Sequence, residues 1–244
     1  MARLFEAENL RKSFGGVKAI DGIDLSIEEG EILGLIGPNG TGKTTLFNLI
    51  GGVFRPDAGR IRFEGRDITE AGPAEVCRRG IARTFQITRP FPLLSVLDNV
   101  RLGRAYGREP AGSLSQAGAE AQKILDSIGL AAKSRVPAGH LGLIDRKRLE
   151  LGKALATRPK LLLLDEIMAG LNPTEIGLAT GLLRRVRASG VTIVVIEHMM
   201  RAITGVSDRL VVLCEGRKIA EGPPESILCD CRVVEAYLGT DEEC

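Results

Sequence analysis

One short segment constrains the fold of this chain more than any other feature. Residues 37–44 read Gly-Pro-Asn-Gly-Thr-Gly-Lys-Thr, which fits the pattern G-x-x-x-x-G-K-[ST] at every fixed position. The segment follows residues 31–36, which we interpret as a strand, and we expect a helix from about 44 to 53. A strand, a glycine-rich turn and a helix in this order predict an α/β layer with a ligand site at the turn.

The residue types in this segment point to a phosphate-binding loop. Glycines let successive backbone N–H groups point inward without a Cβ in the way, and the N-terminus of the following helix adds the positive end of its dipole. We expect Lys43 to reach the β- and γ-phosphates of a nucleotide and the Thr44 hydroxyl to bind Mg²⁺. A glycine-rich turn that contains a lysine by chance is the alternative, and the flanking strand and helix argue against it. The predicted nucleotide-binding residues of the loop are Gly37, Pro38, Asn39, Gly40, Thr41, Gly42, Lys43, Thr44 and Thr45.

The composition is that of a globular protein. Hydrophobic residues make up 44% of the chain and charged residues 26%, and the net charge of +2 gives no general electrostatic attraction to nucleic acid. The N-terminus has no apolar stretch typical of a signal peptide. The longest apolar runs, 161–164 and 191–196, are far too short to span a bilayer. We therefore expect a soluble protein that reaches a membrane only through partners and does not bind nucleic acid.

Strand-like runs alternate with helical stretches along most of the sequence, so we expect a largely parallel sheet covered by helices. The middle of the chain, approximately 90–157, is dominated by helical patterns, clearest at 119–128 and 146–157. We interpret it as a helical subdomain inserted into a single domain that spans 1–244. The predicted strands are 20–27, 31–36, 161–164 and 191–196, and a hairpin joins 209–214 to 218–221.

Polar side chains follow two of the apolar runs. Asp165 and Glu166 come directly after 161–164, so a buried strand delivers two carboxylates to the sheet edge where α/β proteins bind ligands. Asp165 suits a Mg²⁺ site and Glu166 suits the polarisation of an attacking water molecule. His198 follows 191–196 by two residues and is a candidate sensor of the γ-phosphate. Solvated acids at an ordinary strand end are the alternative, which the upstream loop makes less attractive.

A phosphate-binding loop, an acid pair about 120 residues later and a histidine about 30 beyond it form a layout that resembles the ATPases of ATP-binding cassette (ABC) transporters. The resemblance covers essentially the whole chain. It implies a P-loop NTPase fold of the ABC type, with a helical subdomain and an N-terminal antiparallel β region, that binds ATP and Mg²⁺. It also implies that Phe14 stacks on adenine and that Gln86 contacts Mg²⁺ or the attacking water. Residues 169–172 resemble the loop that crosses the dimer interface in this family.

Two segments resemble a narrower group. Residues 80–86 (Gly-Ile-Ala-Arg-Thr-Phe-Gln) and 234–239 (Val-Glu-Ala-Tyr-Leu-Gly) are similar to those of the larger ATPase in branched-chain amino-acid importers. That resemblance implies a second ATPase subunit, two transmembrane permease subunits and, indirectly, a periplasmic solute-binding protein. It implies a location on the cytoplasmic face of the inner membrane. Neither segment carries chemistry that defines the cargo.

The sequence departs from the family at the signature segment. The family pattern Leu-Ser-Gly-Gly-Gln is replaced by Leu-Gly-Leu-Ile-Asp at 141–145. The serine hydroxyl and two glycines that contact the partner's γ-phosphate are missing, and a carboxylate at Asp145 is unfavourable near a phosphate. We expect Asp145 to cap the following helix and the basic run 146–148 to offset its charge. Our hypothesis is that a different ATPase subunit is the preferred partner, although a homodimer stays open. Ile167, where the family usually has proline, changes only the stiffness of its loop.

Two other functions compete with transport. A non-transport ABC ATPase acting on nucleic acid or ribosomes usually has two cassettes or long coiled coils, and this chain has neither pattern. A module whose assembly is controlled by nucleotide, with weak hydrolysis, is favoured by the altered signature. The presence of Lys43, Asp165 and Glu166 argues against it.

Overall fold

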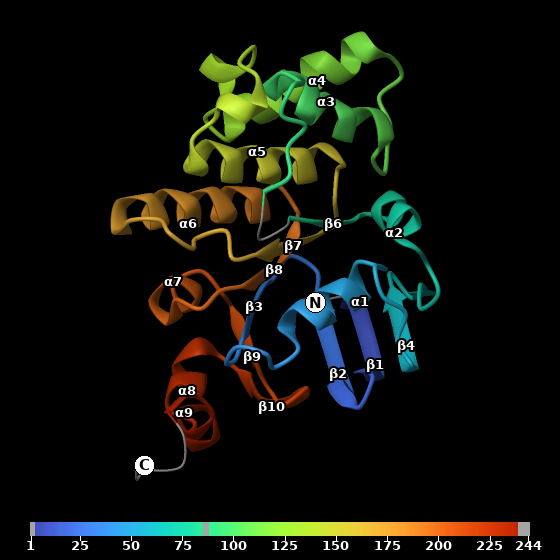
Figure 1. Ribbon diagram of the computed structural model, residues 1–244, viewed down its shortest axis with the longest axis vertical. Coiled ribbons are helices and arrows are strands. Elements are labelled where there is room, and N and C mark those ends of the chain that lie inside the picture. The colour runs from blue at the N-terminus through green and yellow to red at the C-terminus, as the bar shows by residue number, and fades with distance from the viewer. Residues whose placement is uncertain (1–2, 85–87, 239–244) are drawn as a thin grey trace. The chain divides into compact units, whose positions relative to one another are not determined.

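The computed structural model describes residues 3–84 and 88–238 and divides the chain into two units. The first unit contains Met1–Pro73 and Met168–Cys244, and the second contains Ala74–Ile167. Figure 1 gives the position of each element along the chain. Each unit has its own buried core, and the phosphate-binding loop belongs to the first.

An antiparallel sheet forms the N-terminal part of the first unit. Its strands lie in the order β2-β1-β4-β5, and they pair antiparallel throughout. Phe5 of β1 lies opposite Phe63 of β4, and both side chains are buried, so apolar cross-strand pairs stabilise one face of this sheet. The expected N-terminal antiparallel region is therefore present. The strands are β1 (Arg3–Phe14), β2 (Val17–Glu28), β4 (Ala58–Phe63) and β5 (Arg66–Asp67).

Four further strands of the first unit carry the loop. They lie in the order β10-β9-β3-β8, and β3 is parallel to both β9 and β8. Every residue of β3 and β8 is buried, which explains their continuous apolar sequences. Because the strands are parallel, the residues after β3 and after β8 lie at the same edge. The strands are β3 (Ile32–Ile36), β8 (Thr192–Ile196), β9 (Arg209–Cys214) and β10 (Arg217–Gly222).

Helices accompany these strands. Figure 1 shows α8 and α9 together beside β10 near the C-terminus, in agreement with their contacts. Asn172 starts α6 with a reciprocal capping box, in which its side chain and that of Glu175 each accept a hydrogen bond from the other's backbone N–H. The helices of the first unit are α1 (Lys43–Ile50), α6 (Pro173–Ala188), α7 (Met200–Thr204), α8 (Pro224–Leu228) and α9 (Cys231–Leu238).

The second unit combines two parallel strands with a helical cluster. The strand β6 (Ile81–Arg83) pairs with β7 (Leu161–Asp165), which again has no exposed residue. The helices α3, α4 and α5 pack against one another. They fall within the range predicted for a helical subdomain, whose bounds at 90 and 157 stay a prediction. The helices are α2 (Pro73–Arg79), α3 (Val96–Tyr106), α4 (Leu114–Ser127) and α5 (Leu143–Ala156).

Helix ends differ from the sequence expectations where capping decides them. The helix expected to reach residue 53 ends at Ile50, because Gly51 and Gly52 follow and Gly52 has a φ of 70°. The expectation that Asp145 caps α5 is wrong. The helix begins two residues earlier, at Leu143, and its N-cap residue is Gly142, without a side-chain cap. Asp145 therefore lies in the first turn.

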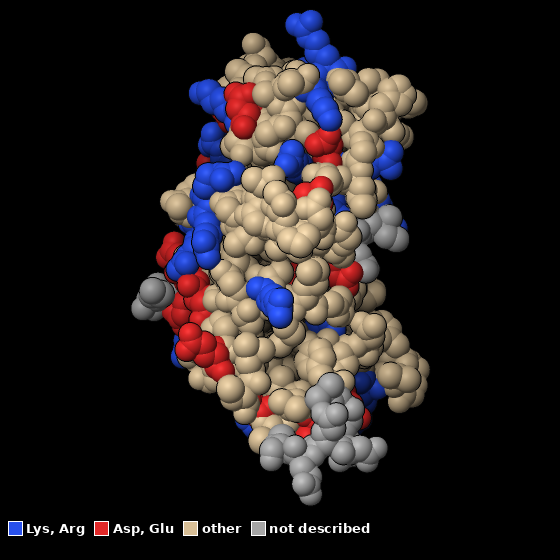
Figure 2. Space-filling model, turned by 90° about the vertical axis from the view of Figure 1, so that its left-hand side faces the viewer, with Lys and Arg blue, Asp and Glu red and all other residues tan. Residues whose placement is uncertain are grey.

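The surface carries charges of both signs. On the face shown in Figure 2, lysine and arginine side chains lie among aspartate and glutamate, with uncharged surface between them. Among the described residues, none of the helices has both the length and the apolar character that a membrane span requires.

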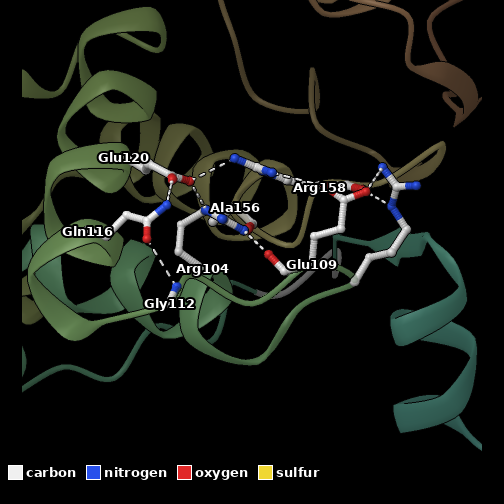
Figure 3. Close-up of polar contacts among 8 residues, drawn as sticks. Arg104, Glu109, Gly112, Gln116, Glu120, Ala156 and Arg158 are labelled. Carbon is white, nitrogen blue, oxygen red and sulfur yellow. Dashed lines mark hydrogen bonds and ion pairs between the residues drawn. The ribbon is translucent and has the colours of Figure 1, made fainter.

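A buried arginine connects the helices of the second unit (Figure 3). Arg104 of α3 is only 2% exposed, and its Nε donates to Glu120 of α4 at 2.5 Å. Its Nη1 donates to the carbonyl oxygen of Ala156, at the end of α5, at 3.4 Å. Arg158 joins the network at 3.0 Å from Glu120 and 2.9 Å from Glu109. Hydrogen bonds from Gln116 and Arg104 hold the pKa of Glu120 below the usual range of a glutamate, and the hydrogen bond from Arg158 does the same for the pKa of Glu109. One side chain thus ties three helices together.

We expect Arg104→Met to lower the free energy of unfolding by about 3 kcal/mol, because it leaves buried acceptors without their donor. Arg101→Met is the matched control on the same helix. Arg101 is 40% exposed and pairs with Asp98 at 2.8 Å, so its loss costs less than about 1 kcal/mol. Urea denaturation followed by circular dichroism measures both variants. Equal stability of the two would contradict the role given to Arg104.

Candidate functional site

The phosphate-binding loop owes its shape to glycines that no other residue replaces easily. A Cβ on Gly37 would lie 2.1 Å from the carbonyl oxygen of Leu213 in β9, and the φ of Gly37 is 147°. A Cβ on Gly42 would lie 2.3 Å from the carbonyl oxygen of Ala19 in β2, at a φ of 99°. Gly40 differs, because its φ is 80° but a Cβ would meet no atom within 4 Å. The loop is therefore pressed between two strands at its ends and is open at its centre.

Lys43 lies inside this loop. Its side chain is buried, with the residue 6% exposed, and Nζ donates to the carbonyl oxygens of Gly37 and Pro38 at 2.7 Å each. Lys43 is also the first residue of α1, so the positive end of that helix faces the same loop. Thr44 is exposed and Thr45 half-buried in the first turn. A cation, a helix N-terminus and an exposed hydroxyl are thus brought together, which is suited to binding a phosphate group.

Other segments of the first unit contact the loop from two further directions. The N–H of Gly216, in the turn between β9 and β10, donates to the carbonyl oxygen of Thr41 at 3.2 Å. The N–H of Gly37 donates to the hydroxyl of Tyr237 in α9 at 2.7 Å. Sequence reasoning missed both contacts, because nothing local to residue 216 or 237 indicates a neighbour in the loop.

Phe14 lies at the end of β1, where the chain turns into β2. Its ring meets that of Phe54 edge to face, with 5.2 Å between centroids, and the ammonium of Lys12 lies 5.6 Å from it. The residue is 44% exposed. Phe14 is therefore not a plain core aromatic residue.

His198 is exposed and follows β8 by two residues. Leu35 of β3 pairs with Ile196 of β8, so His198 and the phosphate-binding loop leave neighbouring strands at the same edge. The residue before it, Glu197, was missed at the sequence level. Glu197 is 2% exposed and accepts a hydrogen bond from the N–H of Met168 at 2.7 Å. Its position after an apolar run is the same signal that singled out Asp165.

The acid pair lies at the end of β7 in the second unit. Asp165 is buried, and its carboxylate forms an ion pair with Arg83 at 2.9 Å. The N–H of Asp165 donates to the hydroxyl of Thr84 at 3.2 Å. Because β6 and β7 are parallel, Arg83 and Asp165 arrive at the same edge. No role was predicted for Arg83, although it lies in the segment 80–86 that resembles the importer ATPases.

Glu166 follows in an unusual backbone conformation, with a φ of 50°. Such a conformation costs free energy in a residue other than glycine and is common at functional sites. Lys147 of α5 holds the segment by donating to the carbonyl oxygens of Glu166 and Ile167, at 3.3 and 3.2 Å. Glu166 and Asp165 line a small pocket together with Thr84, Thr88, Lys147, Glu150 and Ile167.

The predicted site residues thus form two groups. The first unit brings the loop 37–45 and His198 to one strand edge and places Phe14 at the end of β1. The second unit holds Asp165 and Glu166. Gln86 lies outside the described residues.

The chain is similar to known proteins along nearly all of its length. The model of the family described as "ABC transporter" matches residues 20–169, and one described as "Branched-chain amino acid ATP-binding cassette transporter" matches 217–243. A probable branched-chain amino acid transport ATP-binding protein LivG from Methanocaldococcus jannaschii is 38% identical over 97% of each chain. The BraF protein of Pseudomonas aeruginosa, named as a high-affinity transport ATP-binding protein for the same amino acids, is 34% identical over 97% of this chain and 98% of its own.

Solved structures of ATP-binding cassettes are also similar to this chain. The ADP conformation of MJ1267, an ATP-binding cassette of an ABC transporter, superposes with a TM-score of 0.89 at 35% identity, covering 98% of this chain and 100% of the other. A dimeric post-hydrolysis state of the cassette MJ0796, bound to ADP and phosphate, gives a TM-score of 0.82 at 25% identity, over 91% and 99%. The chain therefore belongs to the ABC transporter family of ATP-binding proteins. It is a nucleotide-binding ATPase of a transporter complex, and the expected P-loop fold of the ABC type is confirmed.

Two glycine substitutions distinguish the stability cost of a positive φ from that of a steric clash with a neighbouring strand. Gly40→Ala introduces a positive φ strain of about 1 kcal/mol into open space. Gly42→Ala adds a clash with the backbone of β2, so we expect it to destabilise the nucleotide-free protein by about 3 kcal/mol. Thermal denaturation without nucleotide compares them. Equal melting temperatures would show that Gly42 is not pressed against Ala19.

Proposed function

We propose that this chain is the ATP-hydrolysing subunit of an importer for branched-chain amino acids, with nucleotide bound at the loop 37–45. The observation that carries the proposal is the burial of the Lys43 ammonium inside a glycine-rich loop at a helix N-terminus. The cargo follows from the relatives, whose names specify branched-chain amino acids. The match of 217–243 to a branched-chain family model supports the same assignment.

The loop provides the contacts to the phosphates. Lys43 exchanges the carbonyl oxygens of Gly37 and Pro38 for β- and γ-phosphate oxygens, and the N–H groups of 39–45 bind the remaining charge. This exchange replaces neutral acceptors by charged ones, which strengthens each hydrogen bond. Phe14 stacks on adenine, for which its exposed ring is suited.

Mg²⁺ fits the oxygen donors available. It prefers hard oxygen ligands and binds through one or two protein groups together with substrate phosphates. Among the described residues there is no cluster of three potential metal-binding side chains, which agrees with a metal bound mainly by nucleotide. The Thr44 hydroxyl, the Asp165 carboxylate and Gln86 would hold the ion, which supplies charge neutralisation of the phosphates when bound.

Hydrolysis needs a base and an oriented water molecule. We assign the base to Glu166, whose carboxylate takes a proton from water as the water oxygen bonds to the γ-phosphorus. The bond from the γ-phosphorus to its bridging oxygen breaks, which gives ADP and phosphate. His198 donates a hydrogen bond to the γ-phosphate, and Gln86 orients the water. Lys147 holds the backbone of the base in place by donating hydrogen bonds to the carbonyl oxygens of Glu166 and Ile167.

The chain acts within a larger assembly. We propose one ATPase domain over 1–244 with a helical subdomain at about 90–157, and a head-to-tail dimer that closes on ATP. Two transmembrane permease subunits bind this dimer at the cytoplasmic face of the inner membrane, and a periplasmic binding protein delivers the solute. The dimeric ADP-bound cassette of 25% identity supports the dimer.

We expect Lys43→Ala to weaken ATP binding by about a hundredfold or more, because it removes a charged donor from the phosphates. Lys123→Ala is the matched control. Lys123 is exposed on α4 in the second unit, so its loss leaves affinity unchanged. Isothermal titration calorimetry measures both. If Lys43→Ala bound ATP with wild-type affinity, the proposal that nucleotide binds at this loop would be refuted.

The choice of partner subunit can be tested with a variant that binds ATP without hydrolysing it. Glu166→Gln keeps ATP binding but loses most turnover, so it holds ATP in place. With this variant alone we expect a monomer by light scattering, with and without ATP, because the segment 141–145 lacks the serine and glycines of the family signature. Addition of a second, different ATPase subunit of the same transporter gives a dimer in the presence of ATP. A tight ATP-dependent homodimer of this chain alone would refute the preference for a heterodimer.

A further inference from the structure

The C-terminal helix reaches the first glycine of the phosphate-binding loop. Tyr237 of α9 accepts a hydrogen bond from the N–H of Gly37 through its hydroxyl, at 2.7 Å and 200 residues away in sequence. Tyr237 is 38% exposed, and the partial burial of its side chain raises the pKa of its hydroxyl, which stays neutral at physiological pH. The sequence segment 234–239 was singled out only for its resemblance, and neither the base, the metal ligands nor the adenine contact uses it.

The helix that presents this hydroxyl is fixed to the first unit. Val233, one turn before Tyr237, is 3% exposed, and residues four apart lie on the same face of a helix. The carbonyl oxygen of Asp230 accepts from the N–H groups of Val233 and Val234, and its carboxylate pairs with Arg232 at 2.6 Å. Both α8 and α9 contact β10. Tyr237 therefore lies on a helix that packs against the first unit through Val233.

Gly37 is constrained on every side that the structure describes. Its N–H is held by Tyr237, its carbonyl oxygen accepts from Lys43, and its missing Cβ gives room to the backbone of Leu213. The loop beyond it contains Gly40 and Gly42, and glycines lose the most conformational freedom when a loop is ordered. Because the first residue of the loop is already fixed, forming the phosphate-binding conformation costs less conformational entropy.

We propose that Tyr237 is a positioning residue for nucleotide binding: its hydroxyl fixes the start of the phosphate-binding loop at Gly37 and couples the C-terminal helix to occupancy of the loop. The proposal rests on nucleotide binding at 37–45, as proposed above. Tyr237 touches no reacting atom, so it acts on affinity and not on the chemical step. Because coupling between two sites is reciprocal, bound nucleotide stabilises the contact of α9 by the same factor.

The first experiment removes one oxygen atom. Tyr237→Phe keeps the ring and loses only the acceptor for Gly37. We expect the Kd for ADP of the chain alone, and the KM for ATP measured with the partner ATPase subunit present, to rise about fivefold, the effect of one hydrogen bond, while kcat is unchanged. Tyr106→Phe is the matched control, because Tyr106 lies on α3 of the second unit and is 76% exposed. Unchanged or tighter ADP binding in Tyr237→Phe, or an equal loss in both variants, would overturn the proposal.

The second experiment leaves Tyr237 intact. The chain has two tyrosines and no tryptophan, so in Tyr106→Phe the only tyrosine emission comes from residue 237. We expect saturation with ADP to change this emission and to reduce its quenching by acrylamide, since the occupied loop holds the hydroxyl more tightly. Emission and quenching that are the same with and without ADP would overturn the coupling even if Tyr237→Phe folded poorly.

The outcomes separate this proposal from the one on which it rests. If the wild-type chain binds neither ADP nor ATP, the nucleotide site itself is lost, and the positioning role with it. If the wild type binds, Lys43→Ala does not, and Tyr237→Phe binds like the wild type, only the role of Tyr237 fails. A raised Kd in Tyr237→Phe, together with an ADP-dependent signal from Tyr237, supports both.

Discussion

The first unit is organised around one buried cation. An ammonium group taken out of water is costly unless hydrogen bonds replace its hydration, and Lys43 has two backbone carbonyl oxygens of its own loop as partners. For those carbonyl groups to face inward, the backbone must turn tightly at Gly37 and pass close to β9 and β2. The strands on either side, the glycines and the position of α1 are thus conditions for burying one charge. An anion that enters the loop meets a cation already desolvated.

The second unit buries a negative charge, which a nearby polar partner likewise compensates. Asp165 is 4% exposed, and the guanidinium of Arg83 compensates its charge. Removal of either partner from such a buried pair leaves an uncompensated charge, which is far more costly than the pair itself. Each unit therefore satisfies its own functional charge without nucleotide. In the nucleotide site proposed above, ligand binding exchanges the partners of these charges and buries no new isolated charge.

The sequence predicted the parts of the site that local pattern encodes. The loop at 37–44, the strand ends at Asp165 and His198 and the buried strands all follow from short-range features, because a buried parallel strand leaves a continuous apolar run. Tyr237 and Arg83 were missed, since their contacts join residues 200 and 82 positions apart. The capping role given to Asp145 was wrong because two apolar residues, Leu143 and Ile144, extend α5 in the N-terminal direction. The local sequence pattern locates the strand ends, but long-range packing decides which side chains meet at the sheet edge.

The contacts of α5 reduce the part that charge plays in the proposed preference for a heterodimer. Asp145 pairs with Lys133 and lies 3.7 Å from Arg148, so its carboxylate is locally compensated. Of the basic run expected to offset it, Arg146 instead donates to the carbonyl oxygen of Gly139, and Lys147 supports the segment after β7. Repulsion of a phosphate by Asp145 is thus weaker than the sequence suggests. The segment still lacks the hydrogen-bond donor and the open space that the serine and glycines of the family signature provide. Leu143 is 57% exposed at the start of α5 and offers a phosphate no side-chain hydrogen bond. The proposed preference for a different partner subunit therefore rests on missing hydrogen bonds more than on charge.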